Sequence, residues 1–287
     1  MKTIKYFIEF LFIKLFFFIF KIIGYKNASN LGAKIGSIFG PLVRSKSLIK
    51  KNIQNSLPNF GDKEIEILTK KMWENYGRIF SEYMYIKKFR IKELEKYLNI
   101  NGTTILDKIK KDKKPVVFIS GHFNNFELMA MQLELYGIEL ATVYRPLNNF
   151  FLNQTMEDLR KNYICKNQIK KGRSGTRQIL ENLKQGNSIA LMIDQRVTEG
   201  IKINFFGDLA STTTIPAQII KKYMCDLVPI YIERNRKYYF KMYVSQPIVI
   251  NIEKSQEEIS KHLNTILEKM ILKNPDQWIW THNRWKK

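Results

Sequence analysis

The stretch Pro115–Leu135, PVVFISGHFNNFELMAMQLEL, predicts a strand, a tight turn and a helix. Its first part, Val116–Ile119, is a short run of β-branched and aromatic residues, which is typical of a buried strand. Ser120 and Gly121 end this run, and from Phe126 onward apolar residues recur at helical spacing. The residues between the two patterns therefore form a turn at the end of a buried strand.

His122 lies in this turn, and Glu127 follows five positions later. On one continuous helix, side chains five positions apart point about 140° away from each other, so the pair could not meet there. A histidine in the loop and a glutamate in the first helical turn can converge, and an imidazole held by a carboxylate is a general base. No Ser or Cys stands immediately beside His122, which favours direct deprotonation of a substrate hydroxyl.

A structural alternative explains the same residues without catalysis. Asn124 and Glu127 have the spacing of a capping box, with the asparagine at the N-cap and the glutamate at the third helical position. The place of the pair at the end of a buried strand favours the catalytic interpretation, because open α/β sheets put their sites there.

Composition limits the class of protein. The chain has 287 residues, 45% of them hydrophobic, and a formal net charge of +22. This charge favours an anionic partner, such as a membrane surface, an acidic protein or a nucleic acid, although a lysine-biased genome would produce much of it without function. Cys165 and Cys225 suggest neither a disulfide framework nor a metal site, and three widely spaced histidines predict no metal centre.

The most hydrophobic segment is residues 4–23, which predicts an N-terminal membrane-anchor helix over residues 1–25. Lys14 lies near its middle, so we expect a tilted or half-inserted helix whose lysines reach the interface. A cleaved signal peptide and a buried core helix are the alternatives. At the other end, the aromatic and basic tail from Trp278 onward also suits a membrane interface.

Strand and helix patterns alternate through the rest of the chain. They predict one α/β domain over residues 26–287, with a central, mainly parallel or mixed sheet flanked by helices. Asp194 directly follows a buried strand, residues 188–193, and so points to the same site. Residues 170–175, KKGRSG, form a basic turn before a helix, where Arg173 could hold phosphate. Further patterns predict helices at 62–86, 154–163, 176–184, 216–224 and 257–272, a strand at 138–143, and an edge hairpin formed by 227–233 and 238–244.

Several of these segments together resemble a known family. His122-x4-Glu127 after a strand is similar to the H-x4-D/E motif of glycerolipid-type acyltransferases, and its glutamate form resembles the late (lauroyl/myristoyl) acyltransferases of lipid A biosynthesis. The similarity spans nearly the whole chain, in the family's order. Besides the hydrophobic N-terminus and the dyad, it is carried by Asn52–Asn59, Tyr144-Arg145-Pro146, Arg173, Asp194, Phe205-Phe206-Gly207 and the ending Trp280-x-His282-x-Arg284-Trp285-Lys286.

The resemblance implies a transferase that moves a fatty acyl chain from acyl carrier protein, or acyl-CoA, to a hydroxyl of a lipid A precursor. His122 would take the hydroxyl proton, Glu127 would orient His122, and Arg145, Arg173 and Asp194 would contact the substrate. The resemblance further implies the cytoplasmic face of a bacterial inner membrane, an anionic lipid acceptor, and a reaction without cofactor, metal or covalent intermediate.

Three other functions remain open from the sequence. A lysophospholipid or glycolipid acyltransferase would use the same dyad. A nucleic-acid-binding protein fits the charge, but the cations are spread along the chain and no binding motif is found, so we expect no nucleic-acid partner. A membrane scaffold would leave the polar residues at the strand ends without a common purpose.

Overall fold

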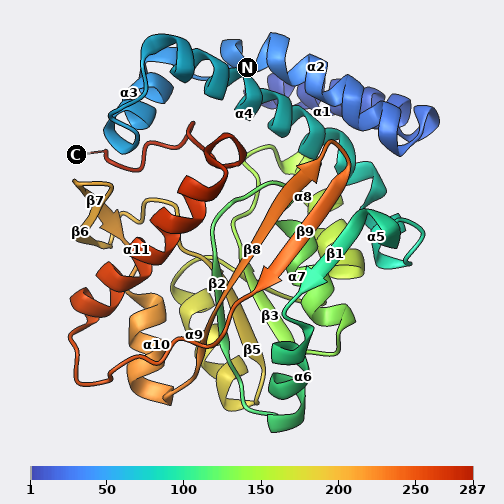
Figure 1. Ribbon diagram of the computed structural model, residues 1–287. Coiled ribbons are helices and arrows are strands. Elements are labelled where there is room, and N and C mark those ends of the chain that lie inside the picture. Colours follow the sequence, from blue (N-terminus) through green and yellow to red (C-terminus); the bar gives the residue numbers. More distant parts are fainter. Residues whose placement is uncertain (1, 287) are drawn as a thin grey trace.

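A computed structural model describes residues 2–286, with all side chains in that range except that of Arg173. Within it, a seven-stranded sheet has the order β1-β9-β8-β2-β5-β3-β4 (Figure 1). Every neighbouring pair in this sheet is parallel except β8 and β9. The sheet strands are β1 (Leu98–Asn101), β2 (Val117–Ser120), β3 (Leu140–Tyr144), β4 (Asn167–Lys170), β5 (Ser188–Met192), β8 (Leu227–Arg236) and β9 (Tyr239–Val244), while β6 (Ile201–Phe205) and β7 (Asp208–Thr212) form a separate antiparallel pair.

Helices lie on both faces of the sheet and over one of its ends (Figure 1). The longer ones are α1 (Lys2–Ile23), α2 (Tyr25–Val43), α3 (Lys46–Ser56), α4 (Asp62–Glu82), α6 (Thr103–Asp112), α7 (Glu127–Leu135), α8 (Phe150–Leu159), α9 (Arg173–Lys184), α10 (Ile215–Tyr223) and α11 (Gln256–Lys273). Shorter helical segments are η1 (Tyr83–Tyr85), α5 (Ile86–Arg90), η2 (Glu95–Tyr97), η3 (Arg160–Ile164) and η4 (Pro275–Gln277).

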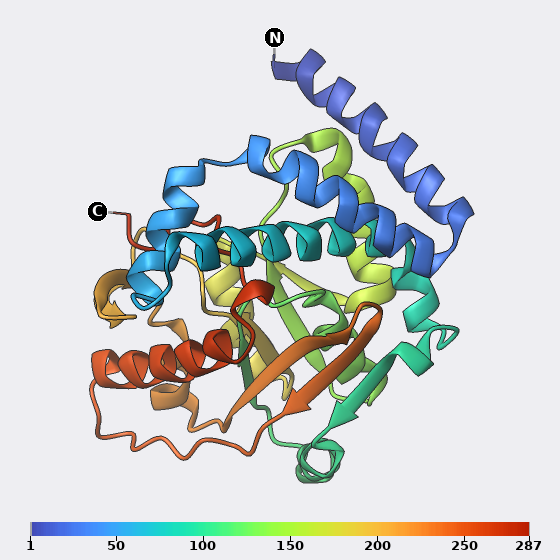
Figure 2. The ribbon, with the colours of Figure 1, turned by 45° about the horizontal axis from the view of Figure 1, so that its top comes forward.

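The predicted α/β class with a mixed central sheet is confirmed. The predicted hairpin is confirmed as β8 and β9, which pair antiparallel. Its expected place at the sheet edge is wrong, because β1 pairs in parallel with β9 and forms the edge itself. The N-terminal segment is helical as expected, and Figure 2 shows α1 along the outside of the molecule with its N-terminal end projecting away. Within residues 2–286, no helix combines the length and the hydrophobicity needed to cross a membrane.

Helix α2 was not expected, because its sequence is interrupted by Gly and Asn residues. Those glycines let it pack closely on α4: a Cβ at Gly36 would lie 2.2 Å from the Trp73 carbonyl oxygen, and one at Gly77 would lie 1.9 Å from that of Gly32. Only glycine allows two helix backbones to approach this closely. The packed pair covers the end of the sheet at which β2 and β5 finish (Figures 1 and 2).

Strand register brings two distant parts of the sequence together. Neighbouring strands β2 and β5 are parallel, with Ser120 opposite Met192. Residues two positions beyond each strand are therefore expected side by side. These residues are His122 and Asp194.

Candidate active site

The His122 imidazole is held by the carboxylate of Asp194. Nδ1 of the ring lies 2.7 Å from Oδ1 of Asp194, and the backbone N–H of His122 donates to Oδ2 at 2.8 Å. The indole N–H of Trp278 donates to the same Oδ2 at 2.9 Å. Asp194 is fully buried, whereas His122 keeps 22% of its side chain exposed. The carboxylate is thus an internal support for the ring, with neither oxygen left facing a substrate.

This geometry decides which ring nitrogen can act as a base. With Nδ1 bonded to a carboxylate, the neutral ring carries its proton there and keeps the lone pair on Nε2. Nε2 of His122 lies 3.4 Å from the side-chain amide nitrogen of Gln195. The pKa of His122 is raised, because Asp194 and Glu127 together outweigh the lowering effect of burial. The pKa of Asp194 is lowered, because burial, which raises it, is outweighed by its bonds to His122 and Trp278.

Glu127 takes a different position from the one expected. Its Oε1 accepts hydrogen bonds from Nε and Nη2 of Arg160, at 2.9 and 2.8 Å, and from the Tyr83 hydroxyl at 3.0 Å. The carboxylate that orients His122 is therefore that of Asp194, not that of Glu127. Glu127 and Arg160 still act on the ring through their charges, which raise and lower the pKa of His122 respectively.

The capping-box alternative is not found either. Helix α7 begins at Glu127, its N-cap is Phe126, and no side chain caps it. Asn124 instead has a φ of 45°, a left-handed conformation that asparagine tolerates better than most residues. Its backbone N–H donates to the Gln277 carbonyl at 3.1 Å, and its side chain accepts from Arg234 at 3.2 Å. The loop carrying His122 is thus fixed from two sides.

Gly121 allows His122 and Asp194 to approach. A Cβ at this position would lie 2.9 Å from the Phe123 ring and 3.2 Å from the Asp194 Cβ. Both distances are shorter than ordinary van der Waals contact, so a larger residue would move the loop or the carboxylate.

The two arginines expected to contact substrate both lie at the carboxyl ends of the parallel strands. Arg145 follows β3 directly and is exposed. Arg173 is the first residue of α9, and its side chain lies outside what the structure describes. The segments that lead to the two arginines are joined by a hydrogen bond, in which the Lys171 N–H donates to the Tyr144 carbonyl at 2.8 Å. Because β2, β5, β3 and β4 are parallel, both turns lie at the same end of the sheet as His122.

The C-terminal segment, residues 274–286, is not the membrane-interface tail that its composition suggested. Trp278 is 2% exposed, and Trp280 and Arg284 are fully buried. Arg284 donates to the Ser211 carbonyl at 2.6 Å and to the Thr212 hydroxyl at 2.8 Å. The segment packs inside the protein because its polar groups find protein partners there.

Arg160, Tyr83 and Trp278 were not predicted as site residues. Arg160 opens η3, a single π-helical turn, and such turns are frequent at functional sites. Their sequence neighbourhoods give no motif, because each reaches the site only through tertiary packing.

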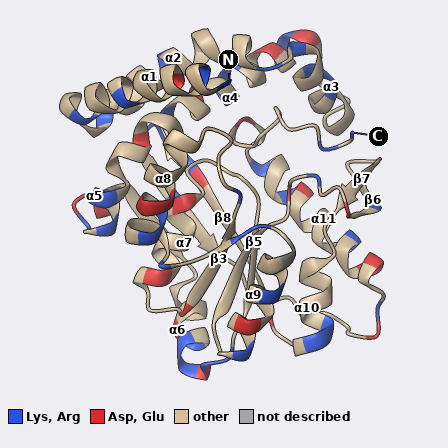
Figure 3. Ribbon diagram, turned by 180° about the vertical axis from the view of Figure 1, so that it is seen from behind, with Lys and Arg blue, Asp and Glu red and all other residues tan. Residues whose placement is uncertain are grey.

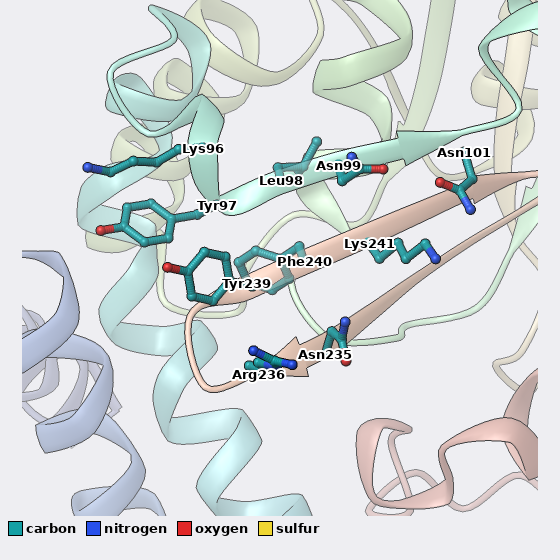
Figure 4. A pocket seen from close by; sticks show the side chains of 10 residues that line it. All are labelled: Lys96, Tyr97, Leu98, Asn99, Asn101, Asn235, Arg236, Tyr239, Phe240 and Lys241. Atoms are coloured by element: carbon teal, nitrogen blue, oxygen red, sulfur yellow. The ribbon is translucent and has the colours of Figure 1, made fainter.

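Two other surfaces of the molecule lack the groups that acyl transfer needs or a concentrated charge. A hollow of about 470 Å³ lies at the β1–β9 edge of the sheet. Figure 4 shows the side chains that line it, which are Lys96, Tyr97, Leu98, Asn99, Asn101, Asn235, Arg236, Tyr239, Phe240 and Lys241. Its lining lacks a histidine or a carboxylate, so it offers no general base. Figure 3 shows Lys and Arg spread over many helices and loops, including α5, α6, α9 and α10, rather than gathered on one element.

Comparison with known proteins identifies the family of the chain. A family model described as "Bacterial lipid A biosynthesis acyltransferase" matches residues 1–287. The chain is 24% identical over 262 residues to the lipid A biosynthesis palmitoleoyltransferase of Escherichia coli (strain K12), covering 89% of this chain and 84% of that protein. It is 23% identical over 268 residues to the lipid A biosynthesis lauroyltransferase of the same strain, covering 90% and 84%.

A third relative is the lipid A biosynthesis acyltransferase of Haemophilus influenzae, which is 23% identical over 272 residues, or 91% of this chain and 85% of that protein. The family match extends over the whole chain, and the matches to these relatives cover 84–85% of their length. The protein belongs to the bacterial lipid A biosynthesis acyltransferase family and is an acyltransferase.

Proposed function

We propose that this acyltransferase moves a fatty acyl chain from the thioester of acyl carrier protein to a hydroxyl of a lipid A precursor, with His122 as the general base. The observation that carries the proposal is the 2.7 Å contact between Nδ1 of His122 and Asp194, which leaves Nε2 facing away from the carboxylate. The names of the relatives support a lipid A precursor as acceptor.

The reaction follows from this arrangement. Nε2 of His122 takes the proton of the acceptor hydroxyl as its oxygen attacks the thioester carbonyl carbon. Asp194 stabilises the imidazolium that forms. The C–S bond then breaks, the imidazolium returns the proton to the leaving thiolate, and an ester bond has replaced the thioester. No residue of the protein becomes acylated.

Negative charge develops on the carbonyl oxygen and requires a donor or a positive charge. The backbone N–H groups of His122, Phe123 and Asn124 already donate to Asp194, Gly121 and Gln277. We therefore assign the role to Arg160, whose guanidinium is oriented by Glu127 and Tyr83. Glu127 thus serves catalysis by holding Arg160. Arg145 and Arg173 would bind anionic groups of the acceptor. Arg145 directly follows β3 and Arg173 begins α9, so both lie at the end of the sheet that carries His122.

Association with a lipid surface, at the cytoplasmic face of the bacterial inner membrane, completes the proposal. Large apolar side chains are exposed on α1 and at the end of α2, among them Phe12 at 59% and Leu42 at 78%. Lys14 and Lys21 on α1 are also exposed and would meet anionic headgroups. The exposed apolar set is Ile4, Phe7, Ile8, Leu11, Phe12, Leu15, Phe18, Ile22, Ile38, Phe39, Leu42 and Val43.

The test is transfer of a labelled acyl group from acyl carrier protein to a tetra-acylated lipid A precursor, by the detergent-purified wild type and by His122→Ala. We expect transfer by the wild type and a loss of about 10²-fold or more in the variant. Parallel reactions with acyl-CoA as donor, and with a lysophospholipid as acceptor, identify the natural pair. Full activity of a folded His122→Ala protein would refute the mechanism. Transfer only to the lysophospholipid would keep the mechanism and replace the acceptor.

A further inference from the structure

The C-terminal segment holds both loops that carry the His122–Asp194 pair. After α11 it passes between α4 and the end of the sheet (Figures 1 and 2). The Gln277 carbonyl accepts the backbone N–H of Asn124 at 3.1 Å, in the loop after β2. Nε2 of His282 accepts the backbone N–H of Arg196 at 2.9 Å, in the loop after β5. One segment therefore sets the spacing between the two loops.

Trp278 makes the contact closest to the chemistry. Its Nε1–H and the His122 backbone N–H both donate to Oδ2 of Asp194, which leaves Oδ1 for the imidazole ring. Because Asp194 is fully buried, solvent water does not reach it to replace a lost donor. The indole N–H therefore determines how the carboxylate is rotated.

We propose that Trp278 is a positioning residue for acyl transfer, whose indole N–H orients Asp194 and, through it, the His122 imidazole. The proposal rests on the role given to His122 in the proposed function. It adds a residue outside the motifs that identified the family, and it assigns the indole nitrogen a task beyond filling the core.

Trp280 provides a matched control on the same segment. It is fully buried, and its ring packs against that of Trp278 with centroids 4.8 Å apart. Its Nε1–H donates to the Pro275 carbonyl at 2.6 Å instead of to Asp194. Trp→Phe at either position removes an indole N–H and a similar volume from one aromatic cluster. The two variants differ in whether the lost bond reaches the active site.

The experiment compares kcat, KM and the pH profile of kcat/KM for wild type, Trp278→Phe and Trp280→Phe. A hydrogen bond to a charged group is typically worth enough for roughly a 10- to 100-fold change in rate, so we expect a fall of that size in kcat for Trp278→Phe, with KM little changed. We also expect the acid limb to move to higher pH, because an Asp194 that has lost one donor is a stronger acceptor for the imidazolium. Trp280→Phe should keep the wild-type limb and most of kcat.

The substitution leaves the other groups around the pair in place. The charged or titratable side chains whose charges act on His122 or that neighbour Asp194 are Tyr76, Glu127, Arg160, His282 and Arg284. General loss of folded protein would lower activity at every pH without moving the limb. A shift in the limb therefore separates positioning from stability.

A second measurement needs no Trp278 variant. In ¹⁵N–¹H spectra of the wild type, the indole N–H of Trp278 should titrate together with His122, while that of Trp280, assigned from Trp280→Phe, should not. The proposal is overturned if the Trp278 signal is insensitive to that titration, or if a folded Trp278→Phe matches Trp280→Phe in kcat and in its limb. Absence of acyl transfer by the wild type would defeat the proposed function, and the indole titration would still test the coupling.

Discussion

Helix α1 and the C-terminal segment are both rich in aromatic and basic residues, yet they lie in opposite environments. Phe12 of α1 is 59% exposed, whereas Trp278 and Trp280 are 2% and 0% exposed. The difference follows from their polar groups. Asn52 of α3 donates to the carbonyls of Trp280 and His282 at 2.8 and 2.9 Å, so the backbone of the C-terminal segment has protein partners.

Helix α1 satisfies its backbone within itself and buries only part of one face, around Phe17 and Phe20. Ile13, Phe16 and Ile23 pack partly against the core, and the first turns contact Phe150 and Phe151 of α8. The opposite face, which carries Phe12, Leu15 and Phe18, is exposed. The comparison teaches that an aromatic, basic composition does not by itself indicate a membrane contact. Tertiary hydrogen bonds decide whether such a segment becomes part of the site or part of the surface.

The largest expected effect concerns the buried site that the C-terminal segment holds. Asp194→Asn should lower kcat by about 10²- to 10⁴-fold, because an amide cannot stabilise the imidazolium and can hold the ring in the wrong tautomer. Binding to vesicles should not change. The assay is acyl transfer alongside vesicle sedimentation of the same preparation. Loss of both properties together would show that the two regions are not separable.

A second prediction concerns how firmly the C-terminal segment is held. Arg284→Met should lower the free energy of unfolding by about 3 kcal/mol, because it removes two charge-assisted hydrogen bonds, to the buried Ser211 carbonyl and Thr212 hydroxyl. Denaturant unfolding measures this. The control is Lys286→Met at an exposed position of the same segment, where a change within about 0.5 kcal/mol is expected. Equal stability of the two variants would mean that the segment is not anchored as described.

Substitutions on the exposed face of α1 should weaken vesicle binding and leave activity unchanged. Phe12→Ser combined with Leu15→Ser should weaken binding to anionic phosphatidylglycerol vesicles by roughly tenfold or more, because about 1.5–3 kcal/mol of apolar burial per side chain is lost. Activity in detergent should stay near the wild-type value. Leu272→Ser, which removes an exposed leucine from α11, is the matched control and should leave binding unchanged. Unaltered vesicle binding by the double variant would remove α1 from the membrane contact.

The smallest predicted effect is on pH dependence. The pKa of His122 is raised, and the base must be unprotonated to act, so the acid limb of kcat/KM should lie above about pH 6.5, the value of a free imidazole. Activity should therefore fall as the pH drops through this raised pKa. A pH series in one detergent buffer measures it, and a limb below the free value would show that Asp194 does not act on the ring as its charge requires.

Local patterns were enough to predict the strand–turn–helix around His122 and the strand that ends before Asp194, because hydrophobic runs and periodicity are properties of neighbouring residues in the sequence. The pairing of β2 with β5 could not be predicted in this way, since it depends on contacts between residues about 70 positions apart. For this reason Asp194 was expected to contact substrate, and Glu127 was expected at the ring. Arg160 and Trp278 carry no local signal at all, because only the packed fold gives each a partner.

The most direct test of the account is which carboxylate holds the His122 ring. The Nδ1 proton of His122 should give a low-field ¹⁵N–¹H signal in the wild type, which requires no substrate to observe. We predict that this signal persists in Glu127→Gln, which changes the bonds to Arg160 and Tyr83 and none to the ring, and disappears in Asp194→Asn. The opposite result, persistence in Asp194→Asn and loss in Glu127→Gln, would contradict the geometry from which the mechanism and the role of Trp278 are both derived.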